Sequence, residues 1–379
     1  MLAHFAHHVL MALMTPLLPF IRDDFALDYT QSGLLLSAFA LSYGISQLPA
    51  GWLADRIGPR ILITIGISGV ALAGLLIGLS QTYTLLIVFF VLMGIAGGGY
   101  HPSASPLISA SVEPNKRGRA LGLHLIGGGA SYFLGPLIAA GIVTTLGWRG
   151  SFVGLATPTI AFGIVFYVLL GRRADIKRAE HEITDTHEKT PSPPGHLRRL
   201  VAFISLNIIV QAVLYSTVAF IPLFMVDHFG ASKETAAVFL AVIYSAGLWA
   251  SPLGGYLSDR LGRVPVTLVV CLIFGPVIYL LTLAPYGLGI GAVLVVLGIF
   301  MYIRMPTAEA YIIGQIPERR RSTILGIYYF AGMEGGGLLT PVMGSLIDRF
   351  GFYTSFTAVA ATLVVVTLVC GIFLWGSRD

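Results

Sequence analysis

The sequence predicts an all-α integral membrane protein, with twelve transmembrane helices arranged as two parallel repeats of six. Of its 379 residues, 56% are hydrophobic and only 11% are charged, whereas a soluble domain carries about 25% charged residues. Such a chain cannot cover its surface with polar groups, so lipid is its expected outer solvent. The segment GWLADRIGPR at 51–60 returns as GYLSDRLGR at 255–263, and this offset of 204 residues indicates a duplicated unit.

Twelve apolar runs are each long enough to span a bilayer, which takes about 20 residues of helix. They are 1–21, 31–54, 60–80, 83–110, 118–146, 150–171, 199–226, 234–258, 264–283, 286–313, 322–348 and 352–376. The first run contains Pro16 and Pro19 and ends in charged residues rather than a cleavage site, so we expect a helix and not a signal peptide. It begins at residue 1, which leaves open a short native N-terminal tail before it.

The only long polar segment, 172–198, is expected to be a cytoplasmic linker between a six-helix bundle at 1–171 and a second at 199–379. Of the 23 lysines and arginines, 18 fall on the side of this linker and four on the opposite side. Because positive charge favours the cytoplasmic side, both termini are expected in the cytoplasm, and the expected location is the bacterial inner membrane.

The repeat extends beyond the charged motif. Pairs at an offset of 204 include Pro102 with Pro306, Arg117 with Arg321 and Gly147 with Gly351. In the first and seventh runs the offset is 203, which pairs His4 with Asn207 and His8 with Gln211. One six-helix unit therefore occurs twice in the same orientation, and parallel halves place a substrate site at their interface near the middle of the membrane.

The doubled motif and the six-plus-six plan resemble the major facilitator superfamily of secondary transporters over essentially the whole chain. The resemblance implies a two-lobed fold with alternating access and a central cavity lined mainly by helices 1, 4, 7 and 10. HFAHHVLMALMTPLLPFI at 4–21, QSGLL at 31–35 and GGGYHPSASPLIS at 97–109 are similar to the fosmidomycin-resistance branch of efflux proteins. Gly135-Pro136 partly matches the antiporter motif of the family, but the residues at 139–141 depart from it, so the direction of transport stays open.

A cytoplasmic latch is expected at the two copies of the charged motif. The glycine that opens each copy allows close helix packing, and the aspartate can bind a helix N-terminus or an arginine. The expected gate residues are Gly51, Asp55, Arg56, Arg60, Arg117, Gly255, Asp259, Arg260, Arg263 and Arg321. The alternative is that the basic residues only set the topology and that the acids are solvated.

Two carboxylates and one guanidinium lie inside the predicted runs, away from their ends: Glu309, Glu334 and Arg304. Charge at membrane depth is unfavourable and usually functional. Arg304 is expected to clamp an anionic group of the substrate, because its planar fork matches carboxylate and phosphate. Glu334 is expected to bind the coupling proton, and a permanent Arg304–Glu334 bridge is the structural alternative. Glu309 lies nearer the cytoplasmic end and is expected to assist proton coupling or the gate.

His4 and His8 lie four residues apart, so they share one face of the first helix. The predicted substrate-binding residues are His4, His8, His101, Asn207, Gln211, Tyr215 and Arg304. His124 joins the two glutamates as a candidate for proton transfer, with a purely structural role as the alternative. The spacing of His4 and His8 also suits metal ligands, but no carboxylate or thiol in that helix completes a site. Neither a metal nor another cofactor is therefore predicted.

The sequence thus predicts a secondary active transporter that moves a small amphipathic or anionic molecule by alternating access, with proton-coupled efflux. The sequence contains neither a GxxxxGK[ST] phosphate loop nor an evident nucleophile–base pair, so no enzyme activity is expected. Two alternatives stay open: an importer or uniporter of an organic anion, and a non-transporting membrane receptor or lipid-handling protein. The expected partners are the small-molecule substrate, protons and membrane lipids, with no nucleic acid, and the expected state is a monomer.

Overall fold

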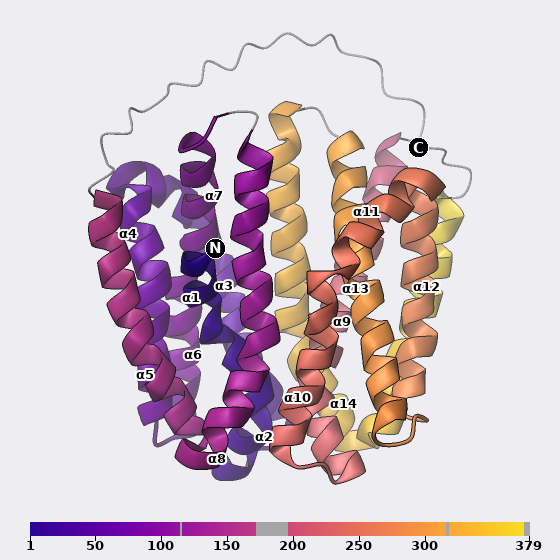
Figure 1. Ribbon diagram of the computed structural model, residues 1–379. Helices are drawn as coiled ribbons and strands as arrows, with labels where there is room; N and C mark the ends of the chain where they lie inside the picture. The colour runs from indigo at the N-terminus through magenta and orange to yellow at the C-terminus, as the bar shows by residue number, and fades with distance from the viewer. Residues whose placement is uncertain (114–115, 172–195, 316–317, 375–379) are drawn as a thin grey trace.

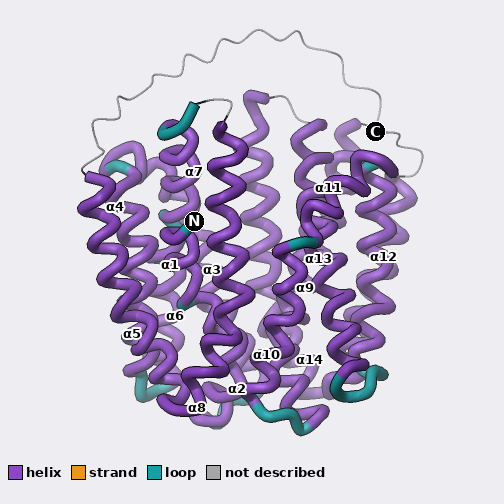
Figure 2. The backbone as a smooth tube through the Cα atoms, viewed as in Figure 1, coloured by secondary structure: helices purple, strands orange, loops and turns teal. Residues whose placement is uncertain are grey.

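The computed structural model describes residues 1–113, 116–171, 196–315 and 318–374. These residues form helices joined by short turns, and no strand is found among them. The first half of the chain builds one group of helices and the second half another, and the two groups stand side by side (Figure 1). Loops and turns lie mainly at the two ends of the bundle (Figure 2).

The helices follow one another in the chain with few residues between them. In the first half they are α1 (Leu2–Val9), η1 (Met11–Leu13), α2 (Met14–Phe25), α3 (Tyr29–Ile57), α4 (Pro59–Thr64), η2 (Ile65–Gly69), α5 (Val70–Leu79), α6 (Tyr83–Gly97), α7 (Tyr100–Ala110) and α8 (Arg117–Gly171). In the second half they are α9 (His196–Phe229), α10 (Lys233–Ser245), η4 (Ala246–Leu248), α11 (Ala250–Leu261), α12 (Arg263–Leu281), α13 (Leu288–Gln315) and α14 (Glu318–Leu374).

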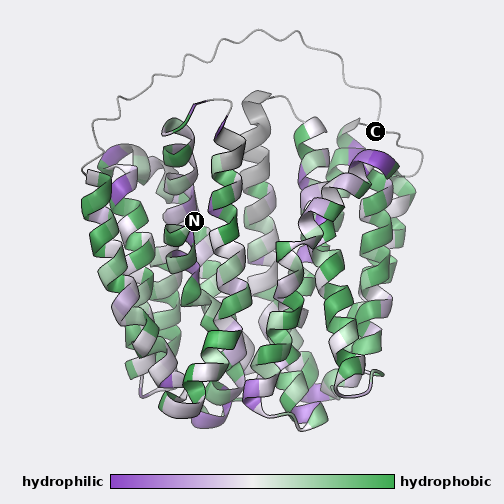
Figure 3. Ribbon diagram, viewed as in Figure 1, coloured by the Kyte–Doolittle hydropathy of each residue, from purple (hydrophilic) through white to green (hydrophobic). Residues whose placement is uncertain are grey.

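Eight of the described helices are long and apolar enough to cross a membrane, and the number rises to ten if each of two bent pairs forms one span. Hydrophobic residues cover the outer helices along much of their length, whereas hydrophilic residues gather towards the ends (Figure 3). α8 and α14 each contain a non-helical residue, Gly147 and Gly351, where the sequence predicts a turn between two runs. The all-helical membrane fold is confirmed, and the count of twelve spans stays a prediction.

The duplication is visible in the backbone angles of equivalent glycines. Gly58 has φ 87° and ψ 146°, and Gly262, 204 residues later, has φ 89° and ψ 144°. Gly147 has φ 67° and ψ 178°, and Gly351 has φ 74° and ψ 172°. Only glycine adopts this region readily. Each half therefore uses glycine for the same two turns, as the repeat in the sequence predicts.

Two predicted runs are not single straight helices. The first, 1–21, is bent by 45° between α1 and the η1–α2 segment, and it continues to Phe25. The predicted run 234–258 is bent by 46° between η4 and α11. In each case a proline follows the short 3-10 segment, and the residue four positions before the proline lies in that segment: Ala12 before Pro16 and Leu248 before Pro252. A proline cannot donate to the carbonyl four residues earlier and its ring clashes with it, which breaks the helix there.

The two halves meet chiefly through α3 against α14 and through α8 against α10. Glycines allow the backbones of α3 and α14 to come close: a Cβ on Gly33 would lie 2.8 Å from the carbonyl oxygen of Thr340, and one on Gly344 would overlap the backbone of Tyr29. Most of the predicted linker 172–198 lies outside the described residues, and α9 begins at His196, three residues before the predicted second bundle.

The turn at Gly262 gives a first testable prediction. Gly262→Ala should lower the melting temperature of the detergent-purified protein, because a side chain in this backbone conformation costs about 1–3 kcal/mol. Gly255→Ala is the matched control in the neighbouring helix, since a Cβ there would meet nothing within 4 Å. Equal melting temperatures for the two variants would contradict the assignment of strain to the turn.

Candidate functional site

Arg304 of α13 is buried, with 1% of its surface exposed, and it binds two amide side chains of α9. Its Nη1 donates to Asn207 Oδ1 at 2.9 Å, and its Nη2 donates to Gln211 Oε1. The Nε of Arg304 has no hydrogen-bond partner, and no ion pair among the described residues includes it. Three predicted site residues thus lie in one cluster, in which the described hydrogen-bond acceptors of the guanidinium are neutral oxygens.

Glu334 of α14 does not lie in this cluster. Its side chain is 8% exposed and its Oε1 has no hydrogen-bond partner. It reaches across the interface between the halves and packs on Gly44 of α3, where a Cβ would overlap Oε1. The structural alternative, a permanent Arg304–Glu334 bridge, is not among the described ion pairs, because the two side chains leave their helices towards different neighbours. The side chain of Glu334 packs on Gly44. Nothing in the sequence predicts this contact, because a glycine has no side chain that could attract a carboxylate.

Five histidines gather in the first half. α1 supplies His4, His7 and His8, α7 supplies His101 and α8 supplies His124. His8 Nε2 lies 3.1 Å from His101 Nε2. The ring of His4 stacks on the ring of His124 with centroids 4.1 Å apart. The predicted residues of helices 1, 4 and 5 thus meet in one place.

Tyr100 and His7 belong to this group as well, although neither was predicted as a site residue. Their rings stack with centroids 4.1 Å apart, and His7 Nδ1 donates to the carbonyl oxygen of Gly66 at 2.6 Å. The spacing of His7 and Tyr100 in the sequence gives no sign of this contact, because it depends on how α1 packs against α7.

Aromatic side chains connect the histidine cluster to the other half. The ring of Tyr132 in α8 lies 5.4 Å from His8 and 5.6 Å from Tyr244 of α10, measured between centroids. The predicted residue Tyr215 packs on Gly336 of α14. Ring contacts therefore run from His8 through Tyr132 to Tyr244 of the other half.

Glu309 is half-buried in α13. It lies five residues after Arg304, so about 140° of helical rotation separates the two residues. Its predicted part in proton coupling or gating stays a prediction.

The predicted gate residues at the motif copies make contacts within their own halves. Arg60 Nε donates to the Tyr167 carbonyl oxygen at 2.8 Å, and Arg263 Nη1 donates to that of Ala310 at 3.1 Å. Arg56 lies over the ring of Trp52 and Arg260 over that of Tyr256.

No described ion pair joins the two copies, and Asp259 is exposed. The prediction of close helix packing at Gly255 is wrong, because a Cβ built there would meet nothing within 4 Å. The close contact lies at the preceding residue: a Cβ on Gly254 would lie 2.5 Å from the carbonyl oxygen of Ile303. Gly51 lies in α3, and the side chains of Asp55, Arg117 and Arg321 lie outside the description. The latch stays a prediction.

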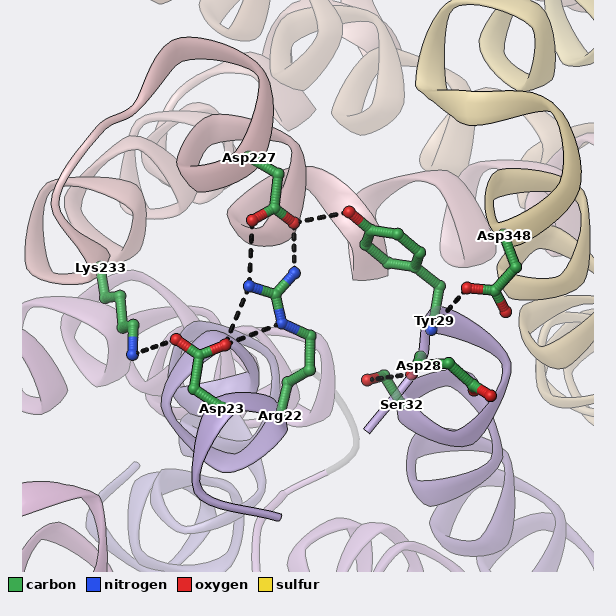
Figure 4. Close-up of polar contacts among 8 residues, drawn as sticks. All are labelled: Arg22, Asp23, Asp28, Tyr29, Ser32, Asp227, Lys233 and Asp348. Carbon is green, nitrogen blue, oxygen red and sulfur yellow. Dashed lines mark hydrogen bonds and ion pairs between the residues drawn. The ribbon is translucent and has the colours of Figure 1, made fainter. Parts of the chain in front are cut away.

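The opposite end of the bundle carries polar contacts between the halves that the sequence did not predict (Figure 4). Arg22 of α2 forms a two-pronged ion pair with Asp227 of α9. The hydroxyl of Tyr29 donates to the same carboxylate at 2.7 Å. Lys233 of α10 pairs with Asp23 of α2. These contacts tie the two halves together at this end.

Asp348 of α14 adds a contact of a different kind, to the first turn of α3. It accepts hydrogen bonds from the backbone N–H groups of Tyr29 at 2.9 Å and Thr30 at 2.8 Å, and from the Thr30 hydroxyl at 2.6 Å. The same turn has its own capping box, in which Asp28 and Gln31 bind each other's backbone N–H groups. Asp348 thus supplies a carboxylate from the second half to a helix end that attracts anions.

Comparison with known proteins agrees with this architecture. The family model of the Major Facilitator Superfamily matches residues 1–248 and 203–379. The chain belongs to the major facilitator superfamily.

Named relatives of this superfamily member are transporters. The probable sulfoacetate transporter SauU of Cupriavidus necator is 26% identical over 94% of this chain and 87% of its own length. The multidrug resistance protein MdtG of Proteus mirabilis is 25% identical over 93% of this chain and 89% of its own.

A solved structure shares the fold. The crystal structure of a bacterial homologue of the human lysosomal transporter Spinster, in an inward-facing and occupied conformation, superposes with a TM-score of 0.79 at 18% identity. The alignment covers 99% of this chain and 94% of that one. Transport across a membrane is therefore the function that the family supports.

The contacts of Arg22 and Asp227 between the halves predict a change in accessibility. Asp227→Asn should speed the labelling of a cysteine at Ser32, which is fully buried beside these contacts, by a membrane-impermeant thiol reagent. Loss of a partly exposed ion pair is worth about 1 kcal/mol, or about fivefold in the open population. Both variants are made in a protein in which Cys271 and Cys370 are replaced by alanine, so that the cysteine at position 32 is the only thiol.

Asp24→Asn is the control, since Asp24 pairs with Arg149 inside the first half. Equal labelling rates in the two variants would show that the Arg22–Asp227 pair does not hold this end shut.

Proposed function

We propose that the protein transports a small organic anion by alternating access, and that Arg304 binds the anionic group. The supporting observation is the buried guanidinium, whose described partners are the neutral oxygens of Asn207 and Gln211. A buried charge without a counter-charge is unfavourable, and an anionic substrate supplies that charge. The similarity to a sulfoacetate transporter favours a short carboxylate or sulfonate.

The orientation predicted from lysine and arginine places the contacts of Arg22 and Asp227 on the non-cytoplasmic side. In this assignment the structure is the state sealed from outside, and the predicted latch at the other end is released. Asp259 is exposed, which agrees with a released latch. Substrate exchange would then alternate between the two ends of the bundle.

Glu334 is the proposed proton site. Its side chain is buried, its Oε1 lacks a hydrogen-bond partner, and it packs on α3 of the other half. A carboxyl in this position changes its surroundings when the halves move relative to each other, and a change of surroundings changes its proton affinity. Coupling would follow because protonation and the movement of α3 against α14 depend on each other.

Proton-coupled efflux of an amphipathic molecule is the second candidate function. The similarity to MdtG favours it, as does the resemblance of residues 4–21 and 97–109 to the fosmidomycin-resistance branch. In this case the histidines and tyrosines of the first half would contact the substrate, and Arg304 would have a structural part. We further propose that the protein lies in the inner membrane as a monomer, with both termini in the cytoplasm.

Substitution of Arg304 separates the two candidates. Arg304→Gln should weaken the binding of sulfoacetate, measured by calorimetry on the purified protein, by about 10- to 100-fold, because a charged hydrogen bond is worth about 1.5–3 kcal/mol. Arg198→Gln is the control, since that arginine is exposed and lies over Phe373 at the bundle surface. Unchanged binding in Arg304→Gln would remove the clamp and leave the efflux candidate in place.

Proteoliposomes test the coupling. An imposed proton gradient should drive the accumulation of labelled anion in symport, or its expulsion in antiport, and the sign gives the direction. Glu334→Gln should abolish the gradient-driven flux but retain exchange of internal for external anion, because the amide cannot release a proton. Glu113→Gln, at an exposed helix end, should behave as the parent. Gradient-driven flux in Glu334→Gln would exclude Glu334 as the proton site.

A further inference from the structure

The histidine cluster of the first half has chemistry that the binding of an anion to Arg304 does not use. Among the described residues, His4, His8 and His101 each offer one ring nitrogen, and these nitrogens lie within 4.8 Å of one another. His4 is 3% exposed and His8 is 8% exposed, so these two rings are buried, and His101 is half-buried. α1 alone provides only two of the three rings, and the third comes from α7. The reason for predicting no metal site, that the first helix lacks a third ligand, therefore no longer holds.

The hydrogen bond of His4 selects the nitrogen that is free to bind a ligand. His4 Nδ1 lies 2.8 Å from the carbonyl oxygen of His124, and since a carbonyl only accepts, Nδ1 carries the proton. The neutral ring then has an unprotonated Nε2, and this nitrogen is buried without a partner. Metal-binding histidines usually donate their other N–H to a backbone carbonyl in this way, which fixes the tautomer and the orientation of the ring.

The spacing of His8 and His101 is close to that of a bound pair. Their Nε2 atoms lie 3.1 Å apart. Two nitrogens at about 2.0–2.1 Å from a tetrahedral ion are about 3.3 Å from each other. Without an ion, one nitrogen must carry a proton and donate it to the other. An ion between them would replace that proton, and the His4 ring would then need to approach by about 1.5 Å to complete a three-nitrogen site.

We propose that His4, His8 and His101 bind one divalent transition-metal ion of the zinc or nickel type. Neutral imidazoles suit these ions, whereas magnesium and calcium prefer oxygen ligands. Three protein ligands leave a fourth position for water or for a carboxylate of the substrate. Because His8 contacts Tyr132, and Tyr132 contacts Tyr244 of the other half, the site lies beside the interface at which the halves move.

The simplest competing account is a metal-free network of stacked rings joined by the His8–His101 hydrogen bond. Both accounts predict that the rings are buried and close together. They differ in that only a metal site gives saturable binding with one ion per chain. They also differ in which histidine is needed for metal binding. A metal site needs His101 as a ligand but does not need His7, whose ring nitrogens contact the Gly66 carbonyl oxygen and the Tyr43 hydroxyl.

The test uses the full chain purified in detergent and stripped with a chelator. Zinc chloride titrated into the parent should show one saturable site by calorimetry, and cobalt should give the visible spectrum of a tetrahedral nitrogen-bound ion. His101→Gln should weaken zinc binding by at least about tenfold, as losses at metal sites do. His7→Gln and His228→Gln should bind as the parent, because His7 is not a ligand and His228 stacks on Phe224 in α9.

Three results would overturn the proposal: no saturable zinc binding by the parent, equal binding in parent and His101→Gln, or a cobalt spectrum of an ion held by oxygen alone. If His101→Gln does not fold, His101→Cys keeps a metal ligand and should restore both folding and binding, and a folded His101→Cys without binding also overturns it. Arg304→Gln should bind zinc as the parent does. Unchanged anion binding in Arg304→Gln with zinc binding intact therefore removes only the anion clamp, whereas weakened anion binding in Arg304→Gln without saturable zinc binding by the parent removes only the metal site.

Discussion

The close contact between α3 and α14 is the constraint on which the rest of the structure depends. Glycines on both helices bring the two backbones together, and this contact joins the halves of the duplicated fold. The same pair of helices carries Glu334 against Gly44 near its middle and Asp348 against the first turn of α3 at one end. A buried ionisable group and a contact that closes one end thus share one surface, so a movement of α14 against α3 changes both.

The two halves share a backbone plan but differ in their chemistry. The matched glycine turns show how closely the second half repeats the first. The first half gathers imidazoles around α1, whereas the second half places a guanidinium between two amides at the equivalent face of α9. Duplication therefore provides two copies of one backbone plan, and substitution inside each copy provides two different polar clusters, which are the proposed binding sites.

Much of the fold could be predicted from the sequence, because hydrophobic run length and the repeat of glycines are local signals. The grouping of Arg304 with Asn207 and Gln211 could also be predicted in part, since the offset between halves equates these amides with His4 and His8. The position of Glu334 could not, because it depends on the packing of two helices that lie about 290 residues apart in the chain. The ion pair between Arg22 and Asp227 was missed for the same reason. A charged residue near a helix end does not indicate which distant residue it will pair with.

The first turn of α3 divides its N–H groups between two carboxylates. Asp348 of the other half accepts from Tyr29 and Thr30, whereas Asp28 of the same turn accepts from Gln31. If the halves separate at this end, as the proposed alternating access requires, the N–H groups of Tyr29 and Thr30 lose their acceptor while that of Gln31 keeps its own. The helix cap shared between the halves would in this way link the proposed mechanical cycle to the local stability of α3.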